Sequence, residues 1–155
     1  MNRRVNGKLI CTGLLMGAAI GLFGNVAPAE AQARLDFEFF KARVAPIFLK
    51  QRSGHARCYV CHQNTTGSSY QYLEKLPEGA SFWTDAQLRT IFDRVSRLVI
   101  PGDPSRSKFA MHPLAPEAGG WTEGGLHSGG RKFADKNDPD WRTIAQWIEG
   151  AKAGQ

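Results

Sequence analysis

The chain has 155 residues, of which 42% are hydrophobic and 22% charged, with a formal net charge of +6. These values exclude a disordered, collagen-like or polytopic membrane protein and indicate one globular domain. The basic residues are scattered without a run of five or six, so the charge gives no nucleic-acid-binding signature.

The first 31 residues have the pattern of an export signal. Arg3, Arg4 and Lys8 precede a mainly apolar stretch over residues 9–27, and small residues follow in Ala29-Glu30-Ala31. This order predicts a signal peptide over residues 1–31 and a mature domain over residues 32–155 in the periplasm or an equivalent exported location. The alternative is an uncleaved membrane anchor, because about 19 residues nearly span a bilayer. The small residues at the exit favour cleavage. The mature chain would carry 17 basic and 13 acidic residues, a charge of +4.

Residues 36–50 are predicted to form an amphipathic helix, since aromatic and aliphatic residues recur at helical spacing. Asp36 is the expected N-cap, and Pro46 is expected to kink or break the helix.

The next feature is the sequence Cys58-Tyr59-Val60-Cys61-His62. Two thiols at this spacing can add across the two vinyl groups of haem, while the adjacent imidazole binds the iron, so the pattern is typical of c-type haem attachment. A dithiol redox centre is the alternative, but no strand pattern precedes the motif as a thioredoxin-like unit requires. Structural zinc would need a second pair of ligands, and the mature chain has only these two cysteines.

The segment 63–82 is expected to be a loop with one short helical turn. Thr84 and Gln87 form a capping box in front of a second amphipathic helix that runs to Leu98. Prolines and glycines make regular structure unexpected over residues 101–137. Asp138 as N-cap and Pro139 as first helical residue predict a final helix with an apolar face.

A haem that only transfers electrons needs a second axial ligand, and several residues could provide it. Met111 has a thioether that raises haem potential, and it lies in the region where a distal methionine is expected. His127 is followed by Ser128-Gly129-Gly130, where glycines would allow the backbone to approach the haem. His112 is a further candidate. His55, three residues before the motif, is interpreted as a surface histidine.

Residues 36–151 resemble a bacterial branch of cytochrome c-like domains found in planctomycete and acidobacterial exported proteins. The resemblance depends on the haem motif and on weaker patterns in the same order along the chain: Pro101-Gly102-Asp103-Pro104, His127-x-Gly129-Gly130, Asp138-Pro139-Asp140-Trp141 and Trp147-Ile148.

The resemblance implies a small all-α domain around one covalently bound haem c, with N- and C-terminal helices that cross. Phe37, Phe40, Trp147 and Ile148 would lie at that crossing, and the helix from Leu88 to Leu98 would wall the haem pocket. Familiar members supply the distal methionine from a Met-Pro-Pro segment, which this chain lacks, so the resemblance favours His62 and His127 as axial ligands.

We therefore expect an exported monohaem electron carrier, without enzymatic activity or a substrate of its own. Its expected partners are redox proteins, with membership of a membrane-associated complex as a further option. The alternative function is a haem enzyme or gas sensor with an open or labile distal position. A third option is an interaction module in which the haem is purely structural.

Overall fold

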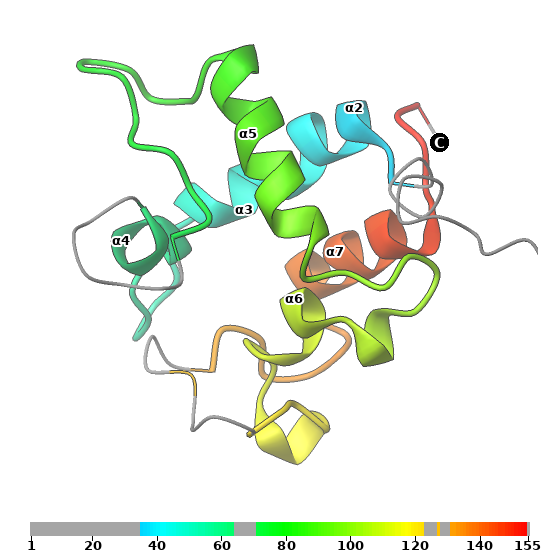
Figure 1. Ribbon diagram of the computed structural model, residues 1–155. Helices are drawn as coiled ribbons and strands as arrows, with labels where there is room; N and C mark the ends of the chain where they lie inside the picture. The colour runs from blue at the N-terminus through cyan, green and yellow to red at the C-terminus, as the bar shows by residue number, and fades with distance from the viewer. Residues whose placement is uncertain (1–34, 64–70, 123–126, 128–130, 155) are drawn as a thin grey trace, which may run out of the picture.

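The computed structural model describes residues 35–63, 71–122, 127 and 131–154, so the predicted signal peptide lies outside the described residues. The described part is helical and has no β-strands, only isolated bridges, which confirms the predicted all-α class. In chain order the elements are α2 (Phe37–Phe39), the π-helical turn η1 (Phe40–Val44), α3 (Ala45–Leu49), α4 (Cys58–His62), α5 (Asp85–Ser96), the 3-10 turn η2 (Pro104–Arg106), α6 (Lys108–Met111), the 3-10 turn η3 (Pro116–Ala118) and α7 (Pro139–Glu149) (Figure 1). Over these residues, none of the helices has the length and apolar character needed to cross a membrane.

The first helix is continuous from α2 through η1 to α3, so of the kink or break predicted at Pro46 the break does not occur, and a π-helical turn lies just before the proline. Asp36 caps it as predicted, accepting a hydrogen bond from the Phe39 amide at 2.6 Å. The proline has no N–H to donate and its ring would crowd the preceding turn of an α-helix. A π-helical turn directly before the proline avoids this crowding, and in that turn the Ala45 amide donates to the Phe40 carbonyl. Pro46 then lies in the first turn of α3, where a missing donor costs little.

The capping box at the start of α5 is confirmed. The Gln87 amide donates to Thr84 Oγ1 at 3.3 Å, and the Thr84 amide donates to Gln87 Oε1 at 3.1 Å. The helix ends at Ser96, two residues before the predicted end.

The two predicted loops have different outcomes. Residues 71–82 contain no helix, and their groups bond elsewhere: the Leu73 amide donates to the His62 carbonyl at 3.0 Å, and Trp83 Nε1 donates to the Glu74 carbonyl at 2.7 Å. Residues 64–70 of the predicted loop, which also could hold the expected helical turn, lie outside the described residues. Residues 101–137 do contain short regular elements, namely η2, α6 and η3. Proline in the first turn favours η2 and η3, and Asp103 accepts from the Arg106 amide to cap η2.

The last helix, α7, packs against the first one. Asp138 accepts hydrogen bonds from the backbone amides of the first turn, as predicted for the N-cap. Trp147 is fully buried: its ring centroid lies 5.2 Å from that of Phe40, and its Nε1 donates to the Asp36 carbonyl at 2.9 Å. Phe37, which was also expected at this crossing, makes its edge-on ring contact with Phe92 of α5, and the two ring centroids lie 5.5 Å apart.

These contacts make one core between α2–α3, α5, α6 and α7 (Figure 1). The Cys58–His62 helix, α4, lies at the edge of this core and packs against α3.

Candidate functional site

The Cys58-x-x-Cys61-His62 motif forms the short helix α4. Cys58 and Cys61 are three residues apart on this helix, so both thiols lie on one face. Cys58 is half-buried, Cys61 is exposed, and neither is in a disulfide. His62 is the last residue of the helix. The two thiols and the imidazole are therefore presented together by a single helical turn.

Residues of the segment that follows α4 hold this helix in place. Tyr59 Oη accepts a hydrogen bond from the Leu76 amide at 3.0 Å, and the Tyr59 ring packs edge-on against Trp83 at 5.9 Å. The Leu73 amide donates to the carbonyl of His62. The position of His62 is thus fixed through its backbone and through its neighbour Tyr59.

The structure brings together three histidines that are far apart in sequence. The ring centroids of His62 and His127 lie 6.0 Å apart, with 26° between the ring planes. His112 packs edge-on against His127 at 5.3 Å. The Tyr72 ring lies 5.8 Å from His62. His127, one of the histidines predicted for the distal position, therefore lies beside His62, and His112, the other, lies beside His127.

Met111, the other candidate for the distal position, belongs to the hydrophobic core. It is the last residue of α6 and is 4% exposed. Its carbonyl accepts a hydrogen bond from the Trp121 amide at 3.0 Å, which ties the following loop to the core. These contacts agree with a packing role, the alternative interpretation of a buried methionine.

His55, predicted to be a surface histidine, is half-buried. It lies in a tight turn with Arg52, whose carbonyl accepts from the His55 amide at 3.2 Å. The Nδ1 atom of His55 is buried and has no hydrogen-bond partner.

Burial dominates the electrostatics of the site. It raises the pKa of the Cys58 thiol, an effect that the positive charges of Lys132 and Arg52 partly offset. Burial also lowers the pKa of His112, and the neighbouring His127 and Lys108 lower it further. Among the described residues, no three His, Cys, Asp or Glu side chains form a group that could hold a metal ion. A haem iron needs only two protein ligands, because the porphyrin supplies the others.

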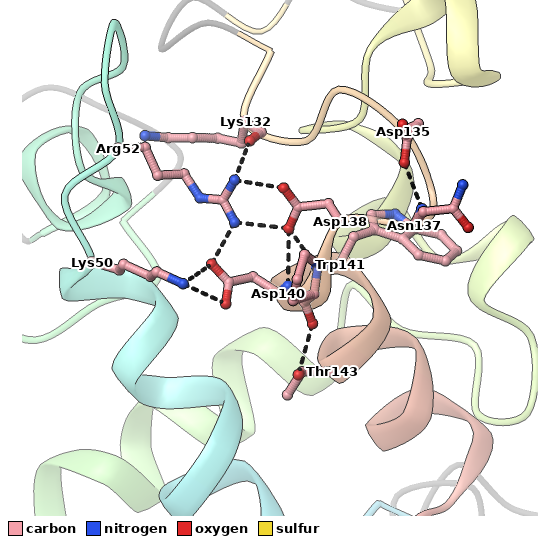
Figure 2. Close-up of polar contacts among 10 residues, drawn as sticks. Lys50, Arg52, Lys132, Asp135, Asn137, Asp138, Asp140, Trp141 and Thr143 are labelled. Carbon is pink, nitrogen blue, oxygen red and sulfur yellow. Dashed lines mark hydrogen bonds and ion pairs between the residues drawn. The ribbon is translucent and has the colours of Figure 1, made fainter.

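Sequence reasoning missed a polar network next to this site (Figure 2). The Arg52 guanidinium donates to both carboxylate oxygens of Asp138, at 2.6 and 2.8 Å, and also to Asp140. Asp140 in turn accepts from Lys50 Nζ at 3.0 Å. The hydrogen bond to Asp138 is the largest effect on Arg52 and raises its pKa. No local pattern identifies Arg52, which lies 86 residues from Asp138.

Comparison with protein-family models, curated proteins and solved structures finds no match to this chain.

Proposed function

We propose that this protein is an exported monohaem c-type cytochrome that transfers electrons between redox proteins. Cys58 and Cys61 would hold the haem through thioether bonds, and His62 and His127 would bind its iron from opposite sides. The observation that carries the proposal is the pair of nearly parallel imidazoles, 6.0 Å apart, beside two thiols of the attachment motif.

The separation of the two rings agrees with shared coordination. A histidine nitrogen binds a metal at about 2 Å, so the centroids of two imidazoles on opposite sides of one metal lie about 6 Å apart. Rings in face-to-face van der Waals contact would be much closer, because nonbonded carbons approach to about 3.5–4.0 Å. The separation of the two ring centroids thus supports His62 and His127 as ligands of one iron.

The surroundings favour His127 over Met111 as the second ligand. Met111 is enclosed by the core, whereas His127 lies against His62 and is supported from another side by His112. Two histidines would give the iron a lower reduction potential than a histidine with a methionine.

The bound haem would supply reversible exchange of one electron at its iron. The protein would contribute the attachment and a fixed ligand set. His62 is positioned by the backbone bond from Leu73, and His127 by its ring contacts. If His62 and His127 both bound the iron, no substrate would bind the iron directly, so we propose a carrier without its own reaction. The export signal over residues 1–31 and the mild positive charge would suit a redox partner outside the cytoplasm.

Absorption spectra of protein produced with the haem-attachment machinery test this proposal. The ferric and ferrous spectra of the wild type are compared with those of His127→Ala, Met111→Ala and His55→Ala, the last being a histidine control outside the ligand pair. We expect covalently bound, low-spin haem in the wild type, and conversion to high spin in His127→Ala alone.

Other outcomes would contradict specific parts of the proposal. A methionine–iron charge-transfer band that disappears only in Met111→Ala would establish His/Met ligation. A five-coordinate ferrous wild type that binds carbon monoxide would favour the gas-binding or enzymatic alternative. Wild-type protein that acquires no covalent haem would remove the proposal altogether.

A further inference from the structure

Among the described residues, two buried side-chain atoms have no hydrogen-bond partner, Lys132 Nζ and His55 Nδ1. Both residues adjoin Arg52: its guanidinium donates to the Lys132 carbonyl at 3.1 Å, and its own carbonyl accepts from the His55 amide. A neutral imidazole nitrogen can either donate or accept, so His55 does not specify a ligand. An ammonium group only donates, and Lys132 is just 4% exposed. It therefore requires an acceptor that the described residues do not supply.

The polar network beside Lys132 leaves this ammonium group without a carboxylate. Asp138 is held by Arg52, and Asp140 is held by Arg52 and Lys50 (Figure 2). Two carboxylates thus face three cations once Lys132 is included, an excess of one positive charge. Figure 2 shows the Lys132 side chain extending away from both aspartates. A buried charge is unfavourable unless it is paired, so the arrangement calls for an anion from outside the network.

The segment that carries Lys132 also places it near the attachment site. The Phe133 amide donates to the Pro113 carbonyl at 3.2 Å, and the Ala115 amide donates to the Phe133 carbonyl at 2.9 Å. These bonds fasten the segment to the chain just after His112. The charge of Lys132 is also felt at the Cys58 thiol, where it opposes the effect of burial on the pKa. Lys132 therefore lies close enough to Cys58 to influence its thiol, on a segment bonded to the chain that follows His112.

We propose that the Lys132 ammonium donates to a haem propionate and so fixes the orientation of the cofactor. This inference rests on the proposed function, because haem is the source of the anion: it carries two carboxylates on the same macrocycle that the thiols attach. The pairing would satisfy a buried donor for which the network has no acceptor. A charge-assisted bond of this kind is stronger than a bond between neutral groups. Lys132 would be a cofactor-positioning residue without a part in iron ligation.

The test compares holoprotein variants by resonance Raman spectroscopy and redox titration. Lys132→Met removes the charge at nearly constant volume. Lys136→Met is the matched control, since it removes the same charge from an exposed lysine four residues away. We expect Lys132→Met to retain covalent haem, to shift the propionate bending mode and to lower the midpoint potential, because a nearby cation favours the reduced iron. Lys136→Met should leave the bending mode unchanged.

A measurement on the wild type covers the case in which Lys132→Met does not accumulate. In the diamagnetic ferrous holoprotein, nuclear Overhauser contacts should connect the Lys132 ε-methylene to a propionate methylene, and their absence would overturn the pairing. An unchanged bending mode and potential in Lys132→Met, with raised thermal stability, would overturn it too and identify an unpaired buried charge. If the wild type carries no covalent haem, the proposed function fails first. If it carries haem without these signatures, only the role of Lys132 fails.

Discussion

Replacing Asp138 by alanine should destabilise the protein by about 2–4 kcal/mol. One part of this is the N-cap of α7, where Asp138 Oδ1 accepts from the amides of Asp140 and Trp141 at 2.9 and 3.3 Å. Losing such a cap costs about 1 kcal/mol. The other part is the bond to Arg52, in which the two side chains are only 20% and 16% exposed. Leaving a largely buried guanidinium with one carboxylate fewer costs about 1–3 kcal/mol.

Urea unfolding of the holoprotein, followed by far-ultraviolet circular dichroism, measures this loss. Asp138→Asn separates the two contributions, since asparagine caps a helix as well as aspartate does but carries no charge for Arg52. Its loss should be smaller than that of Asp138→Ala by about 1 kcal/mol. Asp93→Ala on the exposed face of α5 is the control and should change stability by less than about 0.5 kcal/mol. If Asp138→Ala costs no more than the control, the network does not stabilise the fold.

Three further predictions follow from individual contacts. Burial raises the pKa of Asp138, but hydrogen bonds from Arg52 and the α7 amides outweigh this and lower it overall. Its contribution to stability is therefore complete above the unfolded pKa of about 4 and is lost as pH falls through the lower folded pKa. The difference in unfolding free energy between wild type and Asp138→Asn should shrink as the pH is lowered from about 6 to about 3, and a constant difference would contradict the assigned pairing. Thr84→Ala should cost about 1 kcal/mol through the capping box, whereas Thr84→Ser should be close to wild type in the same urea assay; equal losses would mean that the cap is not responsible. Gly120→Ala should cost about 2 kcal/mol or more, because the new Cβ would lie 2.0 Å from the carbonyl oxygen of Leu114, and an unchanged thermal midpoint would disprove this close approach.

The first helix shows how far a local rule applies. Proline in the middle of a helical pattern predicts a break, and the sequence contains nothing that says how the chain will avoid it. The π-helical turn lets the helix continue, and the Phe40 side chain within it packs against Phe92 and Trp147. The burial of this aromatic group offers a physical reason for continuing the helix: tertiary packing can outweigh a local preference.

Local signals in the sequence were enough for the helical class and for the helix starts at Asp36, Thr84 and Asp138. Caps and apolar periodicity involve residues within one or two turns of each other, so their physics is present in the sequence itself. The motif from Cys58 to His62 is equally local, and its five adjacent residues are enough to predict haem attachment, which stays a prediction.

Contacts between distant segments could be decided only by the tertiary structure. The meeting of His62 with His127 and His112 depends on loops whose backbone bonds go to other segments, as with Leu73 and Phe133. The pairing of Arg52 with Asp138 and the burial of Lys132 depend on the course of the same loops. Loop closure is set by the sum of many weak contacts and has no short sequence pattern. For that reason the sequence left three candidates for the distal ligand, Met111, His112 and His127, whereas the fold places His127 beside His62 and Met111 in the core.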